Sequence, residues 1–326
     1  MAVFNFLRSD FGDRRAGLSH FPCASLHGDG CDYPLCHLDH AAGLADGSGP
    51  AQAAQRLFPM GGRRPGMSFI SINNIWQEYG DHVVLERINL QVKAGEFCSM
   101  VGASGCGKST FLRLLLGQEK PTRGEITLDG KALATEPDRS RGVVFQRYSV
   151  FPHLNVLDNV AIGLELPASP LSGRLFGARK RAARQQARQM LDKVGLGNAL
   201  DKYPAQLSGG MQQRLAIAQA FIMQPRVLLL DEPFGALDPG IRKDMHALLL
   251  QLWSETRMTV FMVTHDLTEG FNLGTRLLVF DKVRHDPQAP HAWGARITYD
   301  IPLNEARMAQ LMTDSKDNVY ALRRQQ

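Results

Sequence analysis

The chain has 326 residues and a mass of 36.1 kDa, and 44% of its residues are hydrophobic, enough for one large domain or two smaller ones. Its 37 lysines and arginines against 32 aspartates and glutamates give a net charge of only +5, which disfavours a dedicated nucleic-acid-binding protein. No apolar run approaches the roughly 20 residues of a membrane-spanning helix. The composition predicts a folded protein that is soluble or peripheral to a membrane.

The segment 1–66 has no sustained helical or strand periodicity. It contains Cys23, Cys31, Cys36 and four histidines, all of them residue types that bind zinc, but the absence of a C-x2-C pair disfavours a metal site. The odd total of five cysteines also disfavours a disulfide framework. Charged residues interrupt the apolar runs at the N-terminus, so no secretory signal is expected and the chain should stay in the cytoplasm. We expect a disordered extension, or a mis-assigned start upstream of Met67.

The pattern changes at residue 68, where apolar and polar residues begin to alternate. Ile70 and Ile72, and then Ile88, Leu90 and Val92, recur at every second position. This period is typical of half-buried strands in an antiparallel sheet.

The segment 96–101 reads as a buried strand that leads directly into the glycine-rich sequence GASGCGKST. This is the pattern G-x-x-x-x-G-K-[ST], with a strand before it and the helical run FLRLLLG after it. The glycines let successive N–H groups point inward at a helix N-terminus, which creates a phosphate site. Lys108 is expected to reach the β- and γ-phosphates, and the Ser109 hydroxyl to bind Mg²⁺. The predicted nucleotide-binding residues of this loop are Gly102, Ser104, Gly105, Cys106, Gly107, Lys108, Ser109 and Thr110.

A second buried strand at 227–230 ends in two adjacent acids, Asp231 and Glu232. Burying two carboxylates without a function would be costly. We expect Asp231 to hold Mg²⁺ through the water shell of the ion. Glu232 is expected to act as the general base that polarises the attacking water, which predicts hydrolysis in addition to binding.

The sequence LSGGMQQR at 207–214 resembles the signature of the ATP-binding subunits of ABC transporters. The resemblance covers about residues 68–282, with the phosphate-binding loop and the signature both complete. The other functional positions of that family match Tyr79, Gln146, Asp231, Glu232, Asp238 and His265.

The resemblance implies an α/β fold, a P-loop NTPase of the ABC type with an antiparallel β-subdomain and a helical subdomain at about 147–222. The ATP-binding domain would span 67–303, with a strand at RITYDI near its end. The segment 304–326 is expected to form a C-terminal helix or tail.

Roles for individual side chains follow from the same resemblance. Gln146 would bind Mg²⁺ and take part in catalysis, and His265 would lie beside the γ-phosphate. Tyr79 would stack on the adenine of ATP, the alternative being a ring packed inside the β-subdomain. Asp238 would belong to the loop through which two subunits communicate. The signature, which opens a helix, would cap the ATP held by a second copy of the chain through Ser208, Gly209, Gly210 and Gln212.

These assignments imply an ATPase that uses ATP and Mg²⁺ as a dimer on the cytoplasmic face of the membrane. It would power the import of a small polar solute through permease subunits, which receive the solute from a periplasmic binding protein, with no nucleic-acid partner. Tyr148, Phe151 and Pro152 are candidates for an apolar contact with the permease. The basic run 174–188 is either a solvated helix face or a site attracted to anionic lipid.

Within the family, the segments 145–166 and 237–253 resemble importers of nitrate, sulfonate, taurine and bicarbonate. Residues 268–270 and 281–290 depart from the usual pattern and resemble a subgroup linked to urea or guanidine degradation. The alternative is an ABC-type ATPase of DNA repair or translation. The first would carry a long coiled coil between the loop and the signature, and the second would repeat the whole motif set, and the sequence has neither feature.

Overall fold

The computed structural model describes residues 69–145, 150–168, 175–284, 288–289 and 291–303. Its strands are β1 (Ile70–Tyr79), β2 (His82–Val92), β3 (Phe97–Gly102), β4 (Arg123–Leu128), β5 (Lys131–Ala132), β6 (Arg141–Val144), β7 (Val227–Asp231), β8 (Thr259–Val263), β9 (Arg276–Asp281) and β10 (Arg296–Pro302). Its α-helices are α2 (Lys108–Leu116), α3 (Val156–Ala168), α4 (Gly177–Lys193), α5 (Gly209–Ile222), α6 (Pro239–Thr256) and α7 (Leu267–Leu273), with short 3₁₀ turns at Gly197–Ala199 and Pro204–Gln206.

A mixed sheet in the order β10-β9-β3-β8-β7-β6 is the centre of the described fold. The strands β6, β7, β8, β3 and β9 run parallel to their neighbours, and only β10 is antiparallel. Both faces are covered, so almost every residue of β3, β7 and β8 is buried, and these strands are mainly apolar without a regular polar alternation. Because these strands are parallel, their carboxyl ends lie along one edge, where ligands bind in open α/β sheets.

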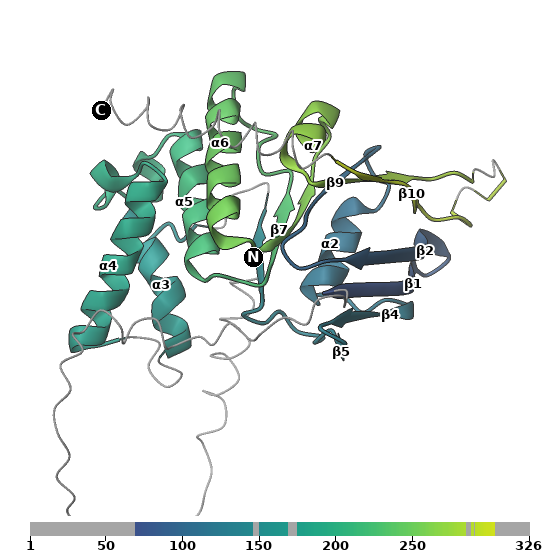
Figure 1. The fold of residues 1–326 in the computed structure, drawn as a ribbon, viewed down its shortest axis with the longest axis horizontal. Coiled ribbons are helices and arrows are strands. Elements are labelled where there is room, and N and C mark those ends of the chain that lie inside the picture. Colours follow the sequence, from purple (N-terminus) through teal and green to yellow (C-terminus); the bar gives the residue numbers. More distant parts are fainter. Residues whose placement is uncertain (1–68, 146–149, 169–174, 285–287, 290, 304–326) are drawn as a thin grey trace, which may run out of the picture. The chain divides into compact units, whose positions relative to one another are not determined.

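The central sheet divides the interior into two apolar clusters. Alternate residues of β7 and β8 point to opposite faces: Leu228 and Val260 join one cluster, while Leu229 and Phe261 join the other. The first cluster includes residues of α3, α5 and α6, and the second includes residues of α2, β1 and β2. Figure 1 shows the corresponding layers, with α5 and α6 on one side of the sheet and α2 with β1, β2 and β4 on the other.

The second sheet has the order β2-β1-β4-β5 and is antiparallel. The period-two prediction for this region is confirmed, because Ile70, Ile72, Ile88, Leu90 and Val92 are all buried within it. The predicted strand before the glycine-rich loop, the helix after it and the strand at RITYDI are also confirmed, as β3, α2 and β10.

The end of the atypical loop after β9 docks on β2. The Val83 N–H donates to the His291 carbonyl at 2.9 Å, and Ala295 and Leu85 form a parallel bridge. A Cβ on Gly294 would lie 2.8 Å from the carbonyl carbon of Leu85, so only glycine fits this close approach. The described end of this loop therefore joins the two sheets.

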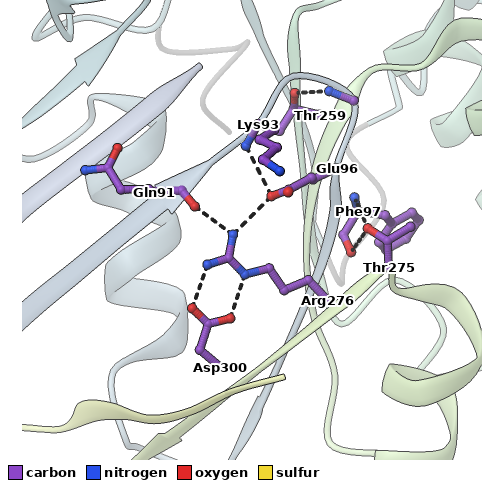
Figure 2. Close-up of polar contacts among 9 residues, drawn as sticks. Gln91, Lys93, Glu96, Phe97, Thr259, Thr275, Arg276 and Asp300 are labelled. Atoms are coloured by element: carbon purple, nitrogen blue, oxygen red, sulfur yellow. Dashed lines mark hydrogen bonds and ion pairs between the residues drawn. The ribbon is translucent and has the colours of Figure 1, made fainter. Parts of the chain in front are cut away.

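Arg276, the first residue of β9, binds residues of three other segments, namely β10, β2 and the turn before β3. Its Nε and Nη2 both donate to the carboxylate of Asp300 on β10, each at 2.6 Å, in a bidentate pair. Its Nη1 donates to the Gln91 carbonyl at 2.6 Å and to the Glu96 carboxylate at 3.1 Å, as Figure 2 shows. The paired carboxylate of Asp300 raises the pKa of Arg276 above its usual range. The cluster of Arg276, Glu96 and Asp300, here called the arginine staple, links β9 to β10, to the end of β2 and to the residue before β3.

We predict that Arg276→Ala destabilises the fold by about 2 kcal/mol, because two carboxylates and a carbonyl lose a charged hydrogen-bond donor. Chemical denaturation of the full chain would measure this change. Arg181→Ala is the surface control, since Arg181 is exposed on α4. Equal stabilities of the two variants would contradict a structural role for the staple.

Candidate active site

The glycine-rich loop connects the carboxyl end of β3 to the start of α2. Gly102 has φ of 152°, and a Cβ there would lie 2.2 Å from the Phe280 carbonyl oxygen. Gly107 has φ of 92° and directly precedes α2, and a Cβ there would lie 2.8 Å from a methyl group of Leu85. Positive φ and close packing therefore both require glycine at these two positions. The loop is held against β9 on one side and β2 on the other.

Lys108 begins α2 and folds back under the loop. Its buried Nζ donates to the carbonyl oxygens of Gly102 and Ala103, each at 2.8 Å, and lies 3.6 Å from the Cys106 Sγ. No side chain caps the N-terminus of α2, so the first N–H groups of this helix remain directed at the loop. An ammonium group and a helix N-terminus thus converge there, which is the arrangement that binds phosphate.

Ser109 and Asp231 bring a hydroxyl and a carboxylate together beside the loop. The Ser109 Oγ donates to Asp231 Oδ1 at 3.2 Å, which links α2 to the end of β7. Burial raises the pKa of Asp231, and the neighbouring charge of Glu232 adds to this, against the opposing hydrogen bond from Ser109. Hydroxyl and carboxylate oxygens are ligands that Mg²⁺ prefers, so the pair fits a magnesium ion bound together with a phosphate.

Glu232 and His265 stand at the carboxyl ends of adjacent strands, β7 and β8. The His265 Nε2 is in contact with Glu232 Oε1. Glu232 has φ of 48° and its N–H donates to the Val263 carbonyl at 3.1 Å. A non-glycine residue in this conformation costs about 1–3 kcal/mol, which the surrounding structure must offset. A carboxylate and an imidazole within contact distance form a proton-accepting pair.

A cavity of about 250 Å³ opens beside this pair. Its walls contain both Glu232 and His265, together with Phe234, Gly235, Arg242, Thr264, Asp266 and Glu269. The predicted signature residues are absent from this lining. The cavity beside Glu232 is therefore formed within one chain, and the signature of that chain does not contribute to its walls.

Tyr79 ends β1 and is 45% exposed. Its hydroxyl donates to the carboxylate of Glu119, whose other oxygen lies 3.0 Å from Arg113 Nη1. Partial burial and then Glu119 raise the pKa of the Tyr79 hydroxyl. The exposed ring is thereby tied to the segment that follows α2. Glu119 was not expected from the sequence, because it belongs to none of the motifs and only the fold brings it to Tyr79.

The signature forms the start of α5. The Ser208 side chain caps this helix by accepting from the Met211 N–H at 3.4 Å. A Cβ on Gly210 would lie 2.9 Å from Ile241, so this glycine allows α5 to pack on α6, whereas a Cβ on Gly209 would meet open space. The Gln212 amide donates to the Pro204 and Leu207 carbonyls at 2.9 and 3.3 Å. Gln212 therefore has a local structural role, and its contact with nucleotide stays a prediction.

Four of the remaining predicted residues lie in the segment after β6. Gln146 and Tyr148 lie outside the described residues. Phe151 is buried, and its backbone N–H and carbonyl both bind the side chain of Asn159, so it is wrong as a surface contact for a permease. Of the three candidates for that contact, Pro152 is exposed. The sequence could not indicate that Phe151 is buried, because its burial depends on hydrogen bonds from its backbone to Asn159 of α3.

Comparisons with known proteins find similar sequences and similar structures. The pattern of the ABC transporter family matches residues 85–235. The bicarbonate transport ATP-binding protein CmpD of Synechocystis sp. is 43% identical over 222 residues, which cover 67% of this chain and 76% of that protein. The nitrate import ATP-binding protein NrtD of Synechococcus elongatus is 40% identical over 251 residues, which cover 74% and 86%. The dimeric post-hydrolysis state of the ATP-binding cassette MJ0796 bound to ADP and phosphate matches with a TM-score of 0.57 and 30% identity, over 72% of this chain and 99% of that one.

We predict that Asp231→Asn raises the thermal unfolding midpoint of the nucleotide-free protein. Burial raises the pKa of Asp231, so its ionised form is less stable in the folded state than in the unfolded chain. The wild-type protein therefore loses stability as the pH rises through the raised pKa of Asp231. Above that pKa, Asp231→Asn should give its full increase in the unfolding midpoint, and this increase should shrink as the pH falls. Differential scanning calorimetry across this range tests the sign. Asp201→Asn, at an exposed carboxylate, is the control, and an equal gain there would contradict the prediction.

Proposed function

The chain belongs to the ATP-binding proteins of ABC transporters, and on that premise we propose that it hydrolyses MgATP at the edge formed by β3, β7 and β8 to power import of a small polar solute. The observation that carries this proposal is the convergence of Lys108, Asp231 and the Glu232–His265 pair at the carboxyl ends of these neighbouring strands. An ATPase of this family needs a phosphate cradle, a metal-binding acid and a base within one site.

In the proposed site, Lys108 and the N–H groups at the start of α2 bind the β- and γ-phosphates of ATP. Ser109, Asp231 and, as predicted from the sequence, Gln146 would hold Mg²⁺, which neutralises phosphate charge when bound. The exposed ring of Tyr79 would stack on adenine. The other predicted residues of the loop, namely Gly102, Ser104, Gly105, Cys106, Gly107 and Thr110, complete the cradle.

The proposed chemical step is an in-line displacement by water at the γ-phosphorus. Glu232 accepts the proton of the attacking water while the bond from the γ-phosphorus to the bridging oxygen breaks, and the products are ADP and phosphate. His265, in contact with Glu232 and on the same edge, orients this carboxylate and donates to the γ-phosphate. The cavity beside the pair gives the water a place within reach of the base.

We further propose that two copies of the chain complete each site. Ser208 and Gly209 open α5, where helix N–H groups favour an anion, and yet the signature is absent from the lining of the Glu232 cavity. A second copy facing the first would place its signature over the bound γ-phosphate. The dimeric state of the solved cassette MJ0796 supports this assembly.

The proposed partners are permease subunits in the membrane, with a periplasmic binding protein acting on the permease and no nucleic acid. Among the described residues, no helix is long and apolar enough to cross a membrane. A peripheral position on the cytoplasmic face of the permease is therefore part of the proposal. The names of CmpD and NrtD concern transport of bicarbonate and import of nitrate, and they favour import over the alternative roles in DNA repair or translation.

We predict that Glu232→Gln lowers ATP turnover by about 10²- to 10⁴-fold, because an amide cannot accept the proton. Binding of ATP should be retained, since the phosphate cradle is unchanged. Phosphate release and equilibrium nucleotide binding measure the two effects separately. The matched control is Glu125→Gln, at an exposed glutamate of β4. Normal turnover in Glu232→Gln would exclude Glu232 as the base.

We also predict that turnover per chain rises with protein concentration until the dimer saturates, because each site needs the signature of a second copy. Ser208→Arg should remove this activity by blocking the capping position of α5. Mixing Ser208→Arg with Lys108→Ala chains should restore one intact composite site per heterodimer, so activity should return above that of either variant alone. Activity that is independent of concentration and no recovery on mixing would contradict the dimer.

A further inference from the structure

Glu269 is a buried carboxylate in the wall of the cavity that Glu232 and His265 also line. It lies in the first turn of α7 and is 6% exposed. Thr264, the residue before His265, donates its hydroxyl to Glu269 Oε2, and His246 Nε2 lies 2.6 Å from Glu269 Oε1. Each oxygen of the buried acid thus has a partner, which a buried charge requires. Glu269 lies in α7, Thr264 directly follows β8 and His246 lies in α6.

The same contacts fix the backbone on both sides of His265. Thr264 donates its N–H to the Met100 carbonyl at 3.1 Å, and its Oγ1 accepts from the Asp266 N–H at 3.1 Å. The Asp266 side chain in turn caps α7 by accepting from the Thr268 N–H at 2.8 Å. His265 is therefore held in a tight turn whose anchor is the Thr264–Glu269 hydrogen bond.

His246 connects this turn to the segment after β7 that contains Glu232. Its ring packs edge-on against Phe234 with centroids 4.8 Å apart, and Phe234 follows Glu232 by two positions. One turn earlier on α6, Arg242 lies 3.7 Å from the Asp266 carboxylate and donates to the Leu237 carbonyl at 3.2 Å. One face of α6 consequently contacts both the segment after Glu232 and the turn at His265.

We propose that His246 and Glu269, the second of which also lines the cavity beside Glu232 and His265, are positioning residues for hydrolysis that hold His265 against Glu232. This inference rests on the proposed function. Through its contacts with Phe234 and Glu269, His246 sets the distance between the segment after Glu232 and the turn at His265. Glu269 sets the orientation of His265 through its hydrogen bond with Thr264. The pair is remote from Lys108 and Ser109 along the chain and has no contact with them among the described residues, so its loss should affect the rate of chemistry and leave nucleotide affinity unchanged.

The test compares kcat, KM for ATP and equilibrium ATP affinity for three variants of the full-length dimer. We expect His246→Leu and Glu269→Gln each to lower kcat by about 10- to 100-fold, with ATP affinity within about twofold of wild type, because misplacement by about 1 Å costs rate but not binding. His246→Gln, which keeps a hydrogen-bond donor for Glu269, should recover most of the lost rate. Glu269→Gln preserves side-chain size and carries the test if His246→Leu fails to fold.

The arginine staple provides a control for stability alone. Arg276 lies at the amino end of β9, opposite the catalytic edge, and Figure 2 shows its contacts with Gln91, Glu96 and Asp300. Arg276→Ala should lower stability and leave kcat per folded chain unchanged. Wild-type kcat in both His246→Leu and Glu269→Gln would overturn the proposal, as would an equal fall of kcat in Arg276→Ala.

A second background separates this inference from the proposed function. In chains that already carry Glu232→Gln, His246→Leu should cause no further loss of turnover, because it acts through the base. Normal turnover of Glu232→Gln would refute the proposed function itself. Inactive Glu232→Gln with fully active His246→Leu and Glu269→Gln would refute only the positioning role.

Discussion

The constraint on which the site depends is burial of the central sheet on both faces. Helices and the second sheet cover β3, β7 and β8, so these strands offer no exposed face for polar side chains. Polar chemistry is confined to the strand ends, and parallel pairing places the carboxyl ends of neighbouring strands side by side. The glycine-rich loop, Asp231 and His265 each follow one of these ends. Proximity in the site therefore follows from strand direction, without long-range pairing of polar groups.

Several features of the site destabilise the folded state. Asp231 carries a raised pKa through burial, Glu232 has a left-handed backbone, and Glu269 is a buried acid. Each costs free energy that the apolar clusters must offset, and such features concentrate at functional sites. The arginine staple instead stabilises the fold, because Arg276, at the amino end of β9, pairs its guanidinium bidentately with Asp300 of β10. The destabilising features and this ion pair thus lie at opposite edges of the central sheet and on different strands.

Local pattern was enough to predict the elements that frame the site. A period of two identified β1 and β2, an unbroken apolar run identified β3 and β7, and a motif with fixed spacing identified the loop before α2. Contacts between distant segments could not be predicted in this way. Glu119, after α2, contacts Tyr79 at the end of β1, Asn159 of α3 binds the backbone of Phe151 in the preceding loop, and His246 of α6 contacts Glu269 of α7. Each contact depends on the tertiary fold. None of these residues belongs to a motif whose spacing carries information about its partner.

Helix α6 contacts both the signature helix α5 and the segments that carry Glu232 and His265. It begins directly after Asp238, in the loop that the sequence assigns to communication between subunits, and it packs against α5, where a close approach at Gly210 admits Ile241. Two turns further on, His246 contacts Phe234 and Glu269. A shift of α6 on dimer formation would therefore move both segments that carry the Glu232–His265 pair. Since the interior is close-packed, such a shift would change their separation instead of being absorbed by loose packing. Hydrolysis would then depend on correct docking of the second copy even though the base, its histidine and the cavity beside them all lie within one chain.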